Sequence, residues 1–382
     1  MEAPAAARIA IDATPLLGPV TGVGTMVREL ATRLPAALAA STGPPVDLGG
    51  YVVSVRGRRD LTDALPAGLE PILTPIPARL AHRAWRSLDR PRVCADRDLV
   101  HGTNYVVPPG PGARLVTVHD LTAWRYPELV DRHSRHYPAL VARAIDCGAH
   151  VHVVSDHVRQ EVVSDLRVPA DRVHLVRNGF TPGPVGDADA GRTQIGRPYV
   201  LALGTIEPRK DHVTLVRAIA RLVDRFDDLV LALVGPPGWG SEQLDREIEA
   251  LGLSTRVRRL GWVDAGRKAD LLAGAELLAF PSRYEGFGLP VLEAMGAGVP
   301  VVSTVAGAIP EVAGDAAELV PPGDPDVLAE AVATVLEDEQ TRARLVAAGR
   351  QRVRQFPWDR SAAALARLYR QLTGERAEVA TG

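Results

Sequence analysis

Two glutamates separated by seven residues could bind one polyhydroxylated ligand. Glu285 lies in the segment Phe280–Ala294, which begins at the end of an apolar run, and Glu293 lies eight positions further on, where a helix is expected. Gly286 and Gly288 let the backbone approach a ligand closely, and the start of a helix offers free N–H groups to an anion. The two carboxylates could each accept hydrogen bonds from different hydroxyl groups. The structural alternative is a helix N-terminus followed by an ordinary surface glutamate.

A pair of adjacent cations follows a second apolar run. Arg209 and Lys210 come shortly after residues 199–203, in a segment that also contains Gly204. A planar guanidinium beside a mobile ammonium suits a diphosphate, although a solvated basic pair is the simpler interpretation. Of the 44 basic residues only Lys210 and Lys268 are lysines. An ammonium at position 210 therefore suggests a specific requirement for that group.

The amino-terminal half carries two weaker signals. Gly22 and Gly24 stand in a short glycine loop between an expected strand at 8–12 and an expected helix at 26–40. The loop is not a full dinucleotide fingerprint, and a tight strand-to-helix turn would explain it equally. His119 directly follows the expected strand at 115–118. A structural histidine is the alternative there.

These segments need strands and helices to position them, and the chain alternates short apolar runs with longer amphipathic stretches. Strands are expected at residues 8–12, 50–55, 99–101, 115–118 and 150–154, and then at 199–203, 229–234, 257–260, 276–280 and 299–303. Helices are expected at 26–40, 131–147, 213–225, 241–250, 268–273, 289–295, 326–354 and 359–372. Such alternation predicts α/β architecture with doubly wound parallel sheets, whose ligands bind at the carboxyl ends of strands.

The length and composition predict two domains of ordinary globular character. The 382 residues are enough for two hydrophobic cores. Residues 178–198 hold five glycines and three prolines, which makes this segment the expected linker.

Composition also excludes several classes of protein. The 44 basic and 46 acidic residues give a net charge of −2, so no excess of positive charge exists to attract nucleic acid. Cys94 and Cys147 are too few for a disulfide framework or a zinc site by themselves. The start of the chain lacks a signal-peptide pattern, and no apolar run approaches the roughly 18 residues of a spanning helix. A cytoplasmic protein is expected.

The motifs together resemble a known family. Asn178-Gly179, the segment from Gly204 to Lys210 and the pair Glu285 and Glu293 occur in this order. The combination resembles the retaining family-4 glycosyltransferases, also called glycosyl transferases group 1. The resemblance implies the GT-B fold, in which two Rossmann-like domains face each other across a cleft. It implies an acceptor-side domain at 1–190, a domain for the nucleotide-sugar donor at 191–358, and a terminal helix at 359–382 that packs back on the first domain.

The activity that this resemblance implies is transfer of a hexosyl group, with retention, from a nucleoside diphosphate sugar to an acceptor hydroxyl. The donor would be a GDP- or UDP-sugar, and the region of His119 and Asp120 favours mannose. The acceptor would be a glycan, a lipid-linked sugar or a small molecule in the synthesis of glycans, polysaccharides or glycolipids. No Asp-x-Asp stands in a loop that would carry a metal, so no metal and no resident cofactor are expected.

Residue roles follow from the same resemblance. The residues expected to act in catalysis are His119, Glu285, Arg209 and Lys210. Those expected to bind the donor are Gly22, Gly24, Arg209, Lys210, Val263, Glu285, Gly286, Phe287, Gly288, Leu289 and Glu293. Among these, Glu293 would bind the ribose, Arg209 and Lys210 the diphosphate, and Glu285 with His119 the sugar.

Three alternatives stay open. A nucleotide-sugar epimerase of the same fold would convert the donor without an acceptor. A non-catalytic subunit of a glycan assembly complex would bind the sugar nucleotide without turnover, although the set of candidate catalytic residues argues against it. A nicotinamide dehydrogenase is disfavoured because no full Gly-x-Gly-x-x-Gly follows the first expected strand.

Residues 79–97 form a further distinct segment. They hold six arginines against two aspartates and have the spacing of an amphipathic helix. One interpretation is peripheral attachment to an anionic membrane, at its inner face, or to a lipid-linked acceptor. A solvated helix in an arginine-rich protein is the other, and the composition alone favours it.

Overall fold

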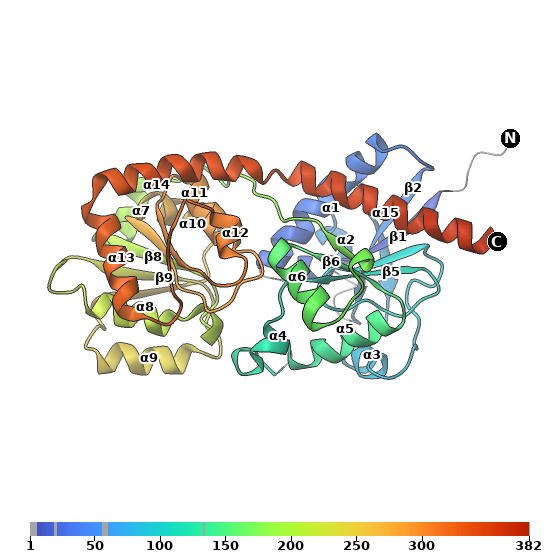
Figure 1. Cartoon of the computed structure of the whole chain (residues 1–382), viewed down its shortest axis with the longest axis horizontal. Coiled ribbons are helices and arrows are strands. Elements are labelled where there is room, and N and C mark those ends of the chain that lie inside the picture. The colour runs from blue at the N-terminus through green and yellow to red at the C-terminus, as the bar shows by residue number, and fades with distance from the viewer. Residues whose placement is uncertain (1–5, 19–20, 56–59, 133, 382) are drawn as a thin grey trace. The chain divides into compact units, whose positions relative to one another are not determined.

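A computed structural model describes residues 6–18, 21–55, 60–132 and 134–381, with side chains described through Gly374. The chain forms two compact α/β units, each built around a parallel sheet (Figure 1). Residues 1–125, 132–179 and 357–382 make up the first unit, and residues 126–131 and 180–356 make up the second. The chain therefore passes into the second unit at residue 180, ahead of the division expected at 190.

The first unit contains a seven-stranded sheet in the order β3-β2-β1-β4-β5-β6-β7. Its strands are β1 (Ala7–Asp12), β2 (Val46–Val53), β3 (Glu70–Thr74), β4 (Leu99–Gly102), β5 (Ala113–Val118), β6 (His150–Val153) and β7 (Val173–Leu175). Every neighbouring pair is parallel. The order reverses between β1 and β4, which is the topological switch point of a doubly wound sheet.

The second unit repeats this arrangement with six parallel strands, in the order β10-β9-β8-β11-β12-β13. Its strands are β8 (Tyr199–Leu203), β9 (Val230–Val234), β10 (Val257–Gly261), β11 (Leu277–Phe280), β12 (Val301–Thr304) and β13 (Glu318–Val320). Every residue of β8, β9 and β11 is buried, as expected for strands covered by helices on both faces. The switch point here lies between β8 and β11.

Helices connect the strands in both units. The first unit holds α1 (Gly22–Ala40), α2 (Leu61–Ala64), α3 (Ala78–Trp85), α4 (Thr122–Arg125), α5 (Tyr137–Asp146), α6 (Asp156–Asp165) and α15 (Trp358–Thr381). The second holds α7 (Ala188–Ile195), α8 (His212–Ala220), α9 (Ser241–Ala250), α10 (Ala265–Ala273), α11 (Leu289–Gly296), α12 (Ile309–Ala313), α13 (Pro325–Glu337) and α14 (Glu339–Arg352). The two-domain α/β prediction with parallel, doubly wound sheets is confirmed.

Three local predictions were wrong, each for a physical reason. The expected linker contains α7, capped by Asp187 and packed so closely on α10 that a Cβ at Gly191 would lie 2.1 Å from the carbonyl oxygen of Asp270. The helix expected at 326–354 is two helices, because Asp338 is extended and caps the second. Helix α1 begins at Gly22 rather than at residue 26, because the Thr21 hydroxyl accepts a hydrogen bond from the Gly24 N–H group.

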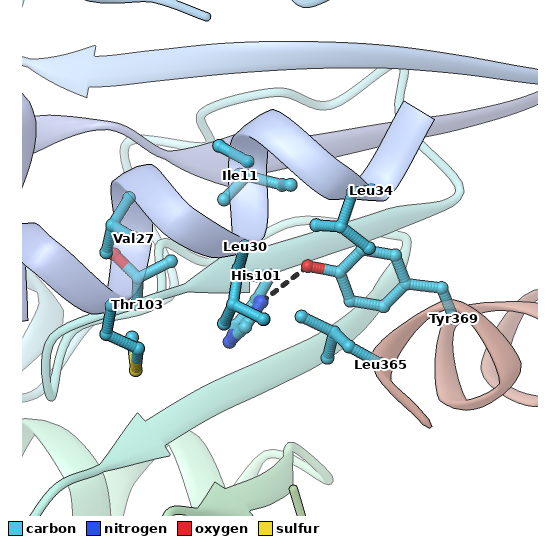
Figure 2. Close-up of a pocket in the computed structure, with 10 residues that line it drawn as sticks. Ile11, Val27, Leu30, Leu34, His101, Thr103, Leu365 and Tyr369 are labelled. Atoms are coloured by element: carbon cyan, nitrogen blue, oxygen red, sulfur yellow. Dashed lines mark hydrogen bonds between the residues drawn. The ribbon is translucent and has the colours of Figure 1, made fainter. Parts of the chain in front are cut away.

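The C-terminal helix α15 packs against α1 within the first unit and is anchored by a buried chain of hydrogen bonds. Tyr369 lies in a small apolar pocket beside Leu34 and Leu365, where its hydroxyl meets Nδ1 of His101 at 2.6 Å (Figure 2). Nε2 of His101 lies 2.8 Å from the hydroxyl of Thr117. The helix is thereby tied to strands β4 and β5.

The chain of hydrogen bonds continues across the sheet and runs in one direction. The Thr117 hydroxyl lies 2.9 Å from Nδ1 of His152, whose Nε2 donates to the Val176 carbonyl at 3.0 Å. Burial lowers the pKa of His152 to about 4 and that of His101 well below its ordinary value, so both rings are neutral. A neutral ring donates from one nitrogen only. Tyr369 therefore donates to His101, His101 to Thr117, and Thr117 to His152.

Tyr369→Phe should lower the free energy of unfolding by about 1–3 kcal/mol, because Nδ1 of His101 would be left buried without a donor. The measurement is urea denaturation, from which the free energy of unfolding is obtained for each variant. Tyr51→Phe is the matched control: the Tyr51 hydroxyl is equally buried and has no hydrogen-bond partner among the described residues. Equal losses in the two variants would contradict the anchoring role.

Candidate functional site

The candidate site of the second unit lies at the switch point of its sheet. Strands β8 and β11 pair only at Val200–Leu277 and Leu201–Leu278, two residues before each strand ends. The loop after β8 (204–211) and the loop after β11 (281–288) leave the sheet side by side at this point. Sheets of this kind bind ligands where the strand order reverses.

The centre of the site is the carboxylate of Glu285, which is bound by cations from the other loop. Oε1 of Glu285 lies 2.6 Å from Nζ of Lys210 and accepts a hydrogen bond from the Ser282 hydroxyl at 2.7 Å. Oε2 lies 3.0 Å from the guanidinium of Arg209. Glu207 pairs with the other end of that guanidinium at 2.7 Å. The sequence motifs at 209–210 and at 285, 75 residues apart, thus form one cluster.

Electrostatics keeps this carboxylate ionised. Burial alone would raise the pKa of Glu285, but Arg209 and Lys210, with hydrogen bonds from Lys210 and Ser282, lower it to about 2. Two cations and two carboxylates make the formal charge of the cluster zero when Glu207 is ionised. Glu285 is therefore an anion at any pH near neutrality. It can accept hydrogen bonds and balance positive charge, but it cannot donate a proton.

Backbone contacts fix the two loops to each other. The backbone N–H group of Arg283 donates to the carbonyl of Arg209 at 2.8 Å, and the guanidinium of Arg209 donates in return to the backbone carbonyl of Tyr284 at 3.0 Å. The Arg283 side chain binds the buried carboxylate of Asp211 at 2.9 Å. Asp211 has a φ of +50°, an uncommon left-handed conformation that ends the short turn carrying both cations.

Residues 286–289 lead from Glu285 into α11. Gly288 has a φ of +104°, and a Cβ there would lie 2.5 Å from Ile309, so the position requires glycine. The ring of Phe287 is buried and packs edge-on against Phe356 at 5.8 Å. Gly286 is buried as well, and Leu289 is half-buried. Because the Phe287 side chain belongs to the core, only the backbone of this residue is suited to the donor role expected of it.

Glu293 and Val263 lie on neighbouring elements of the same unit. Glu293, on α11, is half-buried and pairs with Lys268 of α10 at 2.7 Å. Val263 is half-buried and follows β10. Both lysines of the chain therefore bind a glutamate of the predicted site: Lys210 binds Glu285, and Lys268 binds Glu293. The sequence drew attention to Lys210 and assigned no role to Lys268.

The first unit holds the remaining predicted residues, Gly22, Gly24 and His119. The two glycines lie in the first turn of α1, and a Cβ at Gly24 would lie 2.7 Å from the carbonyl oxygen of Pro15. The expectation that they form a loop ahead of the helix was wrong. The close approach of the loop to Gly24 explains a glycine there without a ligand.

His119 follows β5, as predicted, and its ring is held from two sides. Nε2 donates to the carbonyl of Thr103 at 2.8 Å, and the ring of Tyr105 packs edge-on at 5.6 Å. Burial lowers the pKa of His119, opposed by the hydrogen bond to Thr103 and by the charge of Asp120. The ring is therefore neutral near pH 7, and its Nδ1 is an acceptor.

Several residues that complete the site carried no signal in the sequence. Ser282 lies inside the segment 280–294, and Asp211 directly follows Lys210, but neither had an assigned role. Gly307 and Ala308, which follow β12, support Glu285 from behind: the Ala308 N–H group donates to the Glu285 carbonyl at 2.8 Å, and a Cβ at Gly307 would lie 2.1 Å from the same oxygen. Only the packing of β12 beside β11 brings them there.

The described ranges contain neither a candidate metal cluster nor a candidate membrane-spanning helix. They contain no group of three or more histidine, cysteine, aspartate or glutamate side chains placed to hold a metal ion. No helix within them has both the length and the apolar character to cross a bilayer.

Comparison with known proteins accounts for nearly the whole chain. The model of Glycosyltransferase Family 4 matches residues 20–183, and that of Glycosyl transferases group 1 matches residues 189–352. This chain belongs to the family-4 glycosyltransferases of the GT-B fold. It follows that the protein is an enzyme that uses a nucleotide sugar. The resemblance inferred from the motifs is confirmed.

Individual relatives of this glycosyltransferase differ in how much they share with it. The O-antigen chain mannosyltransferase B of Escherichia coli is 28% identical over 367 residues, which are 92% of this chain and 96% of the relative. A phosphatidyl-myo-inositol mannosyltransferase of Mycolicibacterium smegmatis is 37% identical over 205 residues, which are 52% of each chain. The crystal structure of Anabaena Alr3699/HepE in complex with UDP and glucose has a TM-score of 0.69 and 19% identity, with 98% of this chain and 99% of that one covered.

Lys210→Arg should destabilise the second unit by about 1–3 kcal/mol, although the charge is kept. Nζ of Lys210 lies between the Glu285 carboxylate and the Phe280 ring, 4.8 Å from the ring centroid, and its side chain is 13% exposed. A guanidinium is larger than an ammonium, so it would have to shift one of these two contacts. Lys268→Arg is the matched control, because that side chain is 36% exposed. Thermal unfolding measures both, and equal stability of the two variants would contradict the requirement for an ammonium.

Proposed function

We propose that this glycosyltransferase transfers a hexosyl group, with mannose favoured, from a nucleoside diphosphate sugar to an acceptor hydroxyl with retention of configuration. The cluster of Glu285, Arg209 and Lys210 at the switch point carries the proposal. The mannosyltransferase relatives support mannose, and the donor is a GDP- or a UDP-sugar. A glycan, a lipid-linked sugar or a small molecule carries the accepting hydroxyl.

The two cations would bind the diphosphate and stabilise it as it leaves. Arg209 and Lys210 both carry N–H donors and a positive charge, and both already contact Glu285. In this proposal the two cations, with the N–H groups at the start of α11, bind phosphate oxygens as negative charge develops on those oxygens. Side chains and backbone N–H groups would supply the positive charge that balances this negative charge. We therefore infer a reaction without a metal or a resident cofactor.

Glu285 would act on the sugar as a fixed anion. Its pKa of about 2 prevents it from protonating a leaving group. A carboxylate held at this position would accept hydrogen bonds from sugar hydroxyls, together with the backbone of residues 286–289, and oppose the positive charge that develops on the sugar ring. The leaving phosphate would then take the proton of the acceptor hydroxyl, with attack on the face it vacates.

The other predicted residues complete the donor contacts in this proposal. Glu293 would bind the ribose hydroxyls, and Lys268 would hold its carboxylate in position. Val263 would lie beside the base. Neutral His119 would accept a hydrogen bond from a sugar hydroxyl at Nδ1. Gly22 and Gly24, in the first turn of α1, would bring backbone close to the donor phosphates and the acceptor.

Arg209→Ala and Lys210→Ala should each weaken binding of GDP at least about tenfold, the cost of about 1.5–3 kcal/mol for one charge-assisted contact. The measurement is isothermal titration of the full chain with GDP, UDP and ADP. Arg217→Ala is the matched control, because Arg217 lies on the exposed face of α8 and pairs with Glu247. Undiminished affinity for GDP in the first two variants would overturn the proposal that Arg209 and Lys210 bind the diphosphate.

Glu285→Gln should separate binding from turnover. Removing one anion from a neutral cluster leaves it with a net positive charge, so GDP should bind more tightly. Sugar transfer should nevertheless fall by at least about 100-fold, as expected for the loss of one preorganised charged contact. Product analysis of the donor alone and of the donor with acceptor measures transfer, and free epimer in the first incubation would indicate the epimerase instead. Weaker binding of GDP together with lost transfer would mean that Glu285 serves only to position the cations.

A further inference from the structure

A surface of the first unit, formed by α3 and the residues after it, concentrates unpaired positive charge. Five arginines occur between positions 79 and 92, and all five are exposed: Arg79, Arg83, Arg86, Arg90 and Arg92. None of them pairs with a carboxylate in the described part of the chain. The one acidic residue in this interval, Asp89, lies 3.4 Å from Arg114 instead.

This lack of partners contrasts with another exposed group of arginines. Arg217 on α8, and Arg221 and Arg225 in the turn that follows it, each pair with a glutamate or an aspartate. The net charge of −2 shows that carboxylates are plentiful. Exposed arginines for which no ion pair is seen among the described residues also occur elsewhere, for example Arg28 and Arg258, so the positive charge alone does not set this surface apart.

Helix geometry directs these cations away from the core. Arg79, Arg83 and Arg86 are spaced at i, i+4 and i+7 along α3, so they form one row. Ala81 and Trp85, on the opposite side, are buried. The row thus faces solvent.

Exposed leucines accompany the row of arginines. Leu80 on α3 is 65% exposed, and Leu88 just after it is 59% exposed. They are the most exposed leucines in the described ranges. Leu88 also borders a small pocket lined by Arg114 and Arg143, and the buried Nε of Arg143 has no hydrogen-bond partner among the residues that the structure describes.

We propose that this surface, residues 79–92 with the neighbouring Arg143, binds an anionic lipid bilayer. Arginines would contact the phosphates of the headgroups, while Leu80 and Leu88 would enter the boundary between headgroups and acyl chains. A nucleic acid or another soluble polyanion would use the arginines but not the leucines. The combination of exposed cations with exposed aliphatic side chains is therefore what favours a membrane. The proposal does not depend on the donor sugar or on the roles of Arg209 and Lys210.

The test is sedimentation of the full chain with vesicles of phosphatidylcholine, with and without phosphatidylglycerol. Binding is expected only to the anionic vesicles and should weaken as salt is raised. The variant R79Q/R83Q/R86Q should bind about 100-fold more weakly, which corresponds to about 1 kcal/mol for each arginine. L80Q/L88Q should bind about tenfold more weakly, since less apolar surface enters the bilayer.

The control variant R217Q/R221Q/R225Q also removes three positive charges, from α8 and the turn that follows it. It should bind anionic vesicles as tightly as the unsubstituted protein does. GDP binding and thermal unfolding, measured on each variant, separate loss of membrane binding from loss of the fold or of the donor site. Equal loss in the control, or equal binding to vesicles of phosphatidylcholine alone, would overturn the proposal. Unchanged binding by L80Q/L88Q, with soluble polyphosphate competing fully, would identify a general polyanion site instead.

Discussion

A carboxylate is stable inside a protein only where other groups replace the water that it has lost, and the second unit is organised around this requirement at Glu285. The replacement comes from Arg209 and Lys210, which belong to a different loop. The ion pairs hold the two loops together at the point where β8 and β11 stop pairing. The backbone exchanges around Arg283 and the left-handed turn at Asp211 then fix where each charge lies. Without Glu285, two cations would repel each other in a half-buried site.

The first unit also buries polar side chains, but it satisfies them with hydrogen bonds between neutral groups instead of ion pairs. The buried rings of His101 and His152 both form hydrogen bonds to the hydroxyl of Thr117. Burial makes a protonated ring unfavourable at both positions. Burial keeps both rings neutral, and neutrality gives every donor along the chain one acceptor. Because this series of hydrogen bonds starts at Tyr369 of α15, the same bonds attach the C-terminal helix to the sheet. Two units of the same topology thus satisfy their buried polar groups in different ways.

The arginines of this chain serve distinct purposes that composition cannot separate. Arg209 is partly buried and binds Glu207 and Glu285, whereas Arg217 is exposed and binds a carboxylate on its neighbouring helix. Arg79 and Arg83 are exposed and have no such partner in the part of the chain that the structure describes, beside the exposed side chain of Leu80. Partner and environment, rather than residue type, distinguish a ligand-binding cation from a surface ion pair and from a cation available to a second surface.

The sequence by itself determined the alternation of strands and helices, the family, and the two motifs at 209–210 and 285–293, because these depend on local patterns and on spacing along the chain. It missed short strands such as β7 and β13, and it assigned α7 to a linker, since such short segments are stabilised by neighbours rather than by their own periodicity. Only the tertiary structure decided that Lys210 binds Glu285, that Lys268 binds Glu293, and that α3 lacks carboxylate partners in the described residues. Those facts depend on which side chains the strand order brings within a few ångströms of each other. Lys210 and Glu285 are 75 positions apart, and no local pattern in the sequence indicates that they are in contact.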